Sequence, residues 1–189
     1  MKKTQPQKHN HNKKGAASHP YRWLFTVFFM AVAISAALSL ASQAMLEGAG
    51  IVIALLILSV FIALGIVFDI LGMSVTAADP KPFHSMASHK EKGAKQALML
   101  LRNADRVSSV CNDVVGDICG IVSGTTGAVI VTQLQQALNT RTVLISVGVT
   151  ALVSGLTIGG KALGKGFAMK QSTRVVYLAG RVLYFFHRK

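Results

Sequence analysis

Three aspartates stand in stretches of this sequence that carry almost no other charge. Asp69 lies near the end of one apolar stretch, and Asp113 and Asp117 lie inside another. Because Asp113 and Asp117 are four residues apart, they share one face of a helix. Carboxylates, carbonyls and hydroxyls are the ligands that hard cations such as Mg²⁺ prefer. The pattern predicts a divalent-cation site, with these candidate metal ligands: Asp69, Ser109, Asn112, Asp113, Asp117, Ser146 and Thr150.

A structural role explains the same acids equally well. An acidic side chain inside a membrane span costs roughly 2.5–3.5 kcal/mol on insertion scales, so it usually has a function or a compensating partner. Asp69 can pair with a Lys or Arg near its end of the helix, and Asp113 and Asp117 can pair with Arg106. The sequence alone leaves both explanations open.

No combination of residues is typical of an enzyme. The chain has no GxSxG, no HExxH, no phosphate loop and no His near the acids of the apolar stretches. Cys111 and Cys119 are eight residues apart without CxxC spacing, which favours packing over a metal or disulfide role. We therefore predict no enzymatic activity and no cofactor, with Mg²⁺ only as a transported ion.

The composition is typical of a membrane protein. Hydrophobic residues make up 51% of the 189 residues and charged residues only 14%, whereas soluble chains average about 25% charged residues. Apolar stretches at 23–41, 51–73, 107–132 and 143–160 are close to the roughly 20 residues that cross a bilayer. We expect an all-α membrane protein with about four transmembrane helices and additional amphipathic belt helices.

The net charge of +13 requires nucleic acid to be considered as a partner. The Lys and Arg residues, however, fall in three clusters: six up to Arg22, six in 79–106 and seven in 161–189. With four spans all three clusters lie on one side, which the positive-inside rule makes the cytoplasm. We predict a plasma-membrane protein with both termini cytoplasmic and no nucleic-acid partner. Cleavage of the first helix as a signal peptide, near Ala41–Ala44, is the alternative.

The chain divides into four segments. Residues 1–20 form a disordered basic tail, and residues 21–50 form a first transmembrane helix and a turn. A transmembrane domain follows at 51–170, with belt helices at 80–106 in which Ala94, Ala97, Leu98 and Leu101 form one apolar face. We expect these short amphipathic helices to lie on the membrane surface. Residues 171–189 form a basic amphipathic segment.

The order of these parts resembles the transmembrane domain of the CorB/CorC magnesium-transport family, which includes the animal cyclin M (CNNM) proteins. The segment Lys92–Arg106 is similar to the family's EGNxxAKxALxLLxNPxR, and Ser109 matches a following Ser. Gly160, Lys165 and Ala168 match the family's GExxPKxxA motif. The resemblance covers roughly residues 51–185. It implies a homodimer that carries Mg²⁺ through the polar middle of its helices.

Several family residues are replaced in this chain. Asp69 and Gly72 stand where the family's FSxxE has Ser and Glu, and Val114–Gly116 occupies the place of its GNN. Lys161 and Gly164 stand where GExxPKxxA has Glu and Pro. The chain also contains no segment similar to the family's ATP-binding CBS domains, so the resemblance implies no regulation by ATP.

Two functions follow from the sequence. The first is a divalent-cation transporter of the CorB type. The second is a membrane scaffold or regulator that keeps the family architecture without transport, which the replacements at Gly72 and Lys161 favour.

Overall fold

The computed structural model of the chain describes residues 20–140 and 142–186, and within them it contains helices and no strand. Four helical stretches are long and apolar enough to cross a membrane. They comprise α1 (Pro20–Leu46), α2 (Ile51–Ala77), the continuous stretch Ala104–Ala137 and α7 (Val143–Lys170). The predicted all-α membrane fold with four spans is therefore confirmed. Residues 1–19 of the tail predicted at 1–20, and residues 187–189 at the end of the C-terminal segment, lie outside the described residues.

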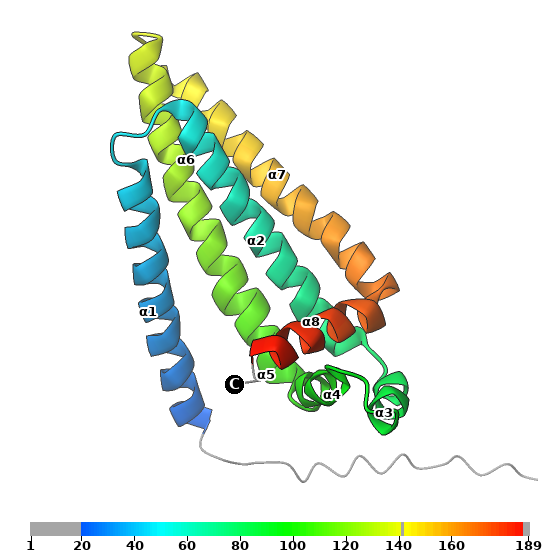
Figure 1. Cartoon of the computed structure of the whole chain (residues 1–189). Helices are drawn as coiled ribbons and strands as arrows, with labels where there is room; N and C mark the ends of the chain where they lie inside the picture. Colours follow the sequence, from blue (N-terminus) through cyan, green and yellow to red (C-terminus); the bar gives the residue numbers. More distant parts are fainter. Residues whose placement is uncertain (1–19, 141, 187–189) are drawn as a thin grey trace, which may run out of the picture.

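The third span is built from three consecutive helical segments. α5 (Ala104–Ser109) leads into a π-helix, η1 (Val110–Gly116), and this continues as α6 (Asp117–Ala137). Three more helices lie outside the spans: α3 (Lys81–Ser88), α4 (Ala94–Arg102) and α8 (Ser172–Phe186). They gather at one end of the bundle, where α8 runs across the spanning helices (Figure 1).

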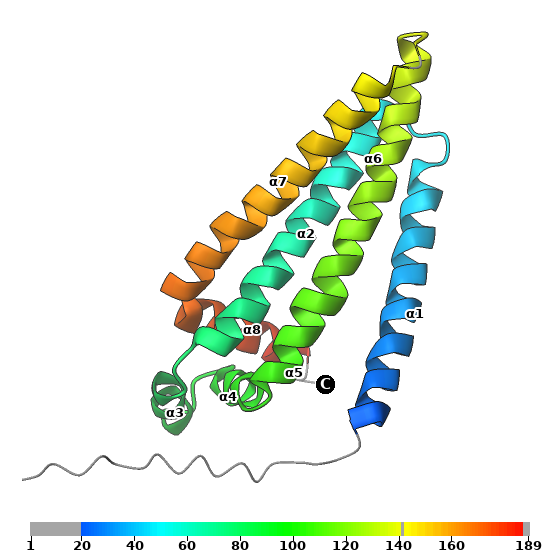
Figure 2. The same ribbon diagram turned by 180° about the vertical axis from the view of Figure 1, so that it is seen from behind.

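α2 is the central helix of the bundle. It lies between α6 and α7 when the molecule is seen from the front and from behind (Figures 1 and 2), and it contacts both helices. Its buried apolar residues Ala54, Ile57 and Phe61 form the core together with residues of α6 such as Val122 and Ile130. Because α2 is central, polar side chains that it carries, such as Asp69, lie inside the bundle.

α1 is attached to the outside of this bundle, mainly along α6. Near one end, the Ser42 and Thr126 hydroxyl oxygens lie 3.4 Å apart, and Gln133 Nε2 donates a hydrogen bond to the Ala49 carbonyl. Large apolar side chains of α1 such as Phe25, Phe28 and Phe29 are exposed. The added first helix therefore has most of its surface free for contact with lipid.

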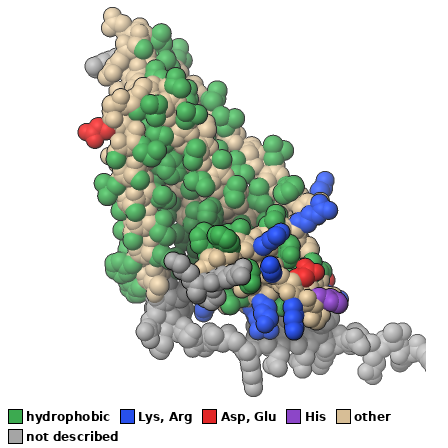
Figure 3. All heavy atoms as spheres, viewed as in Figure 1, with side chains coloured by type: hydrophobic (Ala, Val, Ile, Leu, Met, Phe, Trp, Pro, Cys, Tyr) green, Lys and Arg blue, Asp and Glu red, His purple; other side chains and the backbone are tan. Residues whose placement is uncertain are grey.

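Hydrophobic side chains cover the sides of the bundle, and basic side chains gather at the end formed by α3, α4 and α8 (Figure 3). We call this end the basic end. Exposed apolar residues such as Val52, Leu56, Leu152 and Leu156 face outward from the spanning helices. Exposed apolar area on this scale indicates a membrane environment. The chain is accordingly a membrane protein.

The belt helix α4 packs closely against the rest of the protein. Ala94 and Ala97 of α4 are fully buried, and Leu98 packs against a cluster at the basic end that contains Val75, Phe83 and Val176. The apolar face of α4 therefore packs on the ends of α2 and α8. The expectation that the belt helices lie on the membrane surface stays a prediction. α8 exposes apolar residues, among them Leu178, Val182 and Phe186.

α7 is longer than the apolar pattern predicted. The expected span ended at Gly160, but the helix continues to Lys170. This continuation includes Lys161, whose side chain forms an ion pair with the buried Asp69 carboxylate inside the bundle. The first three basic residues of the cluster at 161–189, Lys161, Lys165 and Lys170, are therefore part of a spanning helix.

Glycines allow α4 and α8 to cross at backbone contact. A Cβ atom built on Gly180 would lie 2.6 Å from the Gly93 carbonyl oxygen and 2.8 Å from the Ala97 nitrogen. Gly93 itself has φ of +93°, a conformation that L side chains rarely adopt. Both glycines are therefore required for this crossing, which joins the belt to the C-terminal helix.

We predict that Gly180→Ala destabilises the protein by about 1–3 kcal/mol, the usual cost of inserting atoms into a packed contact. The matched control is Gly166→Ala in α7, because a Cβ atom there has no neighbour within 4 Å. In an exposed helix that change stabilises by roughly 0.5–1 kcal/mol. Thermal unfolding of the two purified variants in detergent should therefore shift in opposite directions. A shift of the same size and sign in both would contradict the close crossing.

Candidate cation centre

A buried ion pair joins the middle of the bundle to α7. Asp69 Oδ2 of α2 lies 3.2 Å from Lys161 Nζ, with the two side chains 9% and 24% exposed. A charged group inside a span is costly unless it is paired. The pair accounts for the presence of both charges in these helices, and the alternative explanation that Asp69 pairs with a Lys or Arg is confirmed.

Gly116 makes room for this pair. A Cβ atom at Gly116 would lie 2.7 Å from Asp69 Oδ1 and 3.6 Å from Lys161 Nζ. The absence of a side chain on η1 thus lets the carboxylate and the ammonium approach the π-helix backbone. Three elements meet at this point: α2, η1 and α7.

Asn112 of η1 packs against α2 about one turn beyond Asp69, toward the basic end. Its side chain lies over Gly72, where an added Cβ would collide with the amide group. Asn112 Nδ2 donates a hydrogen bond to Ser108 Oγ at 3.2 Å, whereas its Oδ1 is buried without a hydrogen-bond partner. Buried polar atoms are nearly always hydrogen-bonded, so an unpartnered amide oxygen needs an explanation. It adds a second oxygen ligand candidate beside the Asp69 carboxylate.

The π-helix η1 was not expected from the sequence. π-Helical turns are rare, and they occur frequently at functional sites. Here the π-helix is the segment that contributes both Asn112 and Gly116 to the polar centre. We define the centre as Asp69, Lys161, Asn112 and the two glycines, Gly72 and Gly116.

Asp113 and Asp117 face a different space. Both line a groove between α1 and the third span, together with Ser35 and Ser39 of α1, and both side chains are exposed. As predicted, the two acids lie on the same side. Neither forms an ion pair with a Lys or Arg in the part of the chain that the structure describes, so the suggested pairing with Arg106 is absent there.

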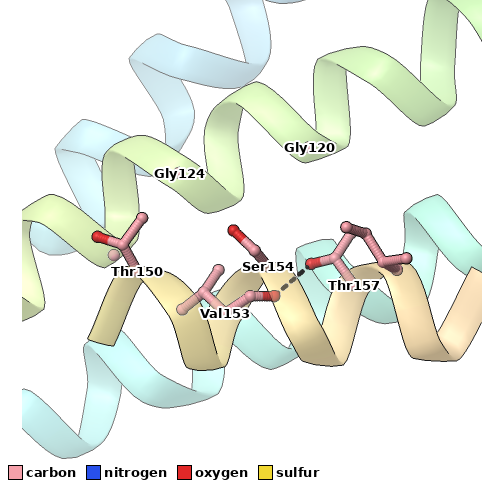
Figure 4. Close-up of a pocket in the computed structure, with 8 residues that line it drawn as sticks. Gly120, Gly124, Thr150, Val153, Ser154 and Thr157 are labelled. Carbon is pink, nitrogen blue, oxygen red and sulfur yellow. Dashed lines mark hydrogen bonds between the residues drawn. The ribbon is translucent and has the colours of Figure 1, made fainter. Parts of the chain in front are cut away.

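The hydroxyl candidates do not join the polar centre. Ser109 ends α5 and is half-buried. Ser146 precedes Lys161 by fifteen residues of α7, which is about 22 Å at 1.5 Å per residue. The Thr150 hydroxyl donates to the Ser146 carbonyl, and Thr150 lines a groove between α6 and α7 with Gly120, Gly124 and Ser154 (Figure 4).

The seven predicted ligands therefore occupy separate places. Asp69 and Asn112 belong to the polar centre, Asp113 and Asp117 to the α1 groove, and Thr150 to the α6–α7 groove. Among the described residues, no three His, Cys, Asp or Glu side chains lie together as a metal site. Lys161, which the sequence analysis did not place in the site, is the principal addition. The sequence signal that could have identified Lys161 is its place in the GExxPKxxA motif, where the family has Glu.

No known protein family, no curated protein and no solved structure matches this chain. The resemblance to the CorB/CorC family thus rests on the motifs quoted above. The structure places three of these segments side by side: Phe68–Gly72 on α2, Val114–Gly116 in η1 and Gly160–Ala168 on α7. Their meeting point is the polar centre.

The ion pair predicts a specific pattern in a double-mutant cycle. Asp69→Asn and Lys161→Met should each destabilise the protein by about 3 kcal/mol or more, because each leaves one buried charge without its partner. The double variant should cost less than the sum of the singles by about 1–3 kcal/mol. Thermal unfolding in detergent measures all four proteins, and Lys165→Met, an exposed lysine one turn away, is the control. Additive effects would mean that the pair does not form.

Proposed function

We propose that this protein transports a divalent cation, with Mg²⁺ as the leading candidate, through a pathway that includes the polar centre. The observation that carries the proposal is the buried Asn112 Oδ1, which has no hydrogen-bond partner and whose side chain packs against Gly72, three residues from Asp69 along α2. Both are oxygen ligands of the kind that Mg²⁺ prefers. The three segments that resemble the family's motifs also meet here, which supports the same assignment.

Asp113 and Asp117 support the proposal from the neighbouring groove. They add two exposed carboxylates beside the same π-helix that contributes Asn112. Carboxylates in this position raise the local concentration of cations before the ions reach a buried site. We propose that they attract the cation and that Asp69 binds it.

The orientation proposed for the chain follows from its charges. If the basic end faces the cytoplasm, as the positive-inside rule predicts, both termini are cytoplasmic in the plasma membrane. The negative interior then favours cation entry by about 2.3 kcal/mol per charge per 100 mV. The homodimer implied by the family resemblance stays a prediction.

A second candidate is a membrane scaffold or regulator that does not transport ions. The Asp69–Lys161 ion pair favours it, because an ammonium group already neutralises the one buried carboxylate of the centre. In this reading the ion pair and the glycine contacts hold the helices together and have no further role.

Mg²⁺ flux into proteoliposomes separates the two candidates. We expect wild-type protein to carry Mg²⁺ above protein-free liposomes, and Asp69→Asn to reduce that flux at least tenfold because the binding carboxylate is gone. Asp113→Asn combined with Asp117→Asn should reduce the flux less, since these groups only attract the ion. Asp105→Asn, which changes an exposed acid of α5, is the matched control and should have no effect.

Folded wild-type protein without any flux would favour the scaffold. Flux that survives Asp69→Asn but disappears in the Asp113/Asp117 double variant would move the pathway to the α1 groove.

A further inference from the structure

The Asp69 carboxylate of the polar centre is paired with a cation of the chain itself. Among the described residues, Lys161 is the basic group that forms an ion pair with a buried carboxylate. Lys165, one turn away on the same helix, is exposed. α7 thus presents one lysine to the interior and one to the outside, so burial of Lys161 is specific to its position.

Two oxygen-bearing side chains pack against helix backbone in the polar centre around Lys161. Gly116 leaves room for the Asp69 carboxylate, which fills the place that a side chain at this position of η1 would take. Gly72 leaves a corresponding space for the Asn112 amide, whose Oδ1 has no hydrogen-bond partner. The ammonium neutralises Asp69 but leaves the amide oxygen unpartnered, whereas an ion with several ligand positions uses oxygens of both types.

A lysine side chain is suited to move its ammonium group away from a carboxylate. Its charge is compact and sits on a flexible four-carbon stem, so it can withdraw without movement of the helix backbone. The Lys161 side chain is also more exposed than the Asp69 side chain, at 24% against 9%, so it is the less enclosed member of the pair.

We propose that the Lys161 ammonium is a tethered competitor for the cation site at Asp69. It holds the carboxylate in the resting protein, and an inorganic divalent cation binds Asp69 and Asn112 when the ammonium withdraws. This inference rests on the proposed cation transport and adds the residue that sets the occupancy of the site. Because the competitor is part of the chain, its effective concentration at Asp69 is fixed, and the apparent affinity for the ion is lowered accordingly.

The test compares the thermal stability of variants in detergent with and without MgCl₂. Lys161→Met leaves Asp69 without a partner, so Mg²⁺ should raise its unfolding temperature and bind at least about tenfold more tightly than to wild type. Lys161→Gln, which removes the charge but keeps a polar side chain, should respond in the same way. The double variant Asp69→Asn/Lys161→Met should not respond, and Lys165→Met should behave as wild type.

Equal Mg²⁺ affinity in wild type and in both Lys161 variants would overturn the competitor role. Failure of both variants to fold even in Mg²⁺ would also overturn it, since a cation that replaces the ammonium must restore the fold. These outcomes differ from failure of the proposed function. If wild type carries Mg²⁺ through liposomes while Lys161→Met binds it unchanged, transport stands and only the competitor role is lost. Absence of flux in wild type and in Lys161→Met removes the transport proposal itself.

Discussion

Close approach of helix backbones to α2 is the constraint on which the rest of this structure depends. Between helices in lipid there is little hydrophobic driving force, so association depends on packing and on polar contacts. Glycines provide the packing here. A Cβ atom on Gly65 would lie 3.2 Å from Cys119 Cβ, and one on Gly164 would lie 2.9 Å from Ile70 Cγ1. α6 and α7 therefore contact α2 from its two sides, and groups on α2 lie in the interior.

The polar centre is a consequence of this approach. With α2 enclosed on two sides, Asp69 is 7% exposed, and a carboxylate so placed interacts strongly with any nearby charge. The Lys161 ammonium supplies that charge from α7, and Gly116 provides the space in which the two groups meet. In the function proposed above, the same geometry serves both stability, because it joins two spans, and cation binding, because it gathers oxygen ligands where water is scarce. These two roles compete for one carboxylate.

The spans could be predicted from the sequence because hydropathy is a local property of a stretch of residues. The shared side of Asp113 and Asp117 could also be predicted, since helical spacing fixes it. The partner of Asp69 could be named only as some Lys or Arg, because pairing depends on how α7 crosses α2. The burial of Ala97 depends in the same way on Gly180, which is far away in sequence. The π-helix has no signal in composition or periodicity.

The π-helix has a consequence for how the chain tolerates changes in length. In an α-helix each residue turns the chain by about 100°, so an insertion or deletion rotates every side chain beyond it to a new face. A π-helical turn contains one residue more than an α-helical turn, so deletion of one residue within η1 leaves an α-helical turn while the helices on both sides keep their orientation. Within the third span, Val110–Gly116 is therefore the segment where we expect the loss of one residue to be tolerated. Elsewhere in that span, the same change would turn the buried face of α6 toward lipid.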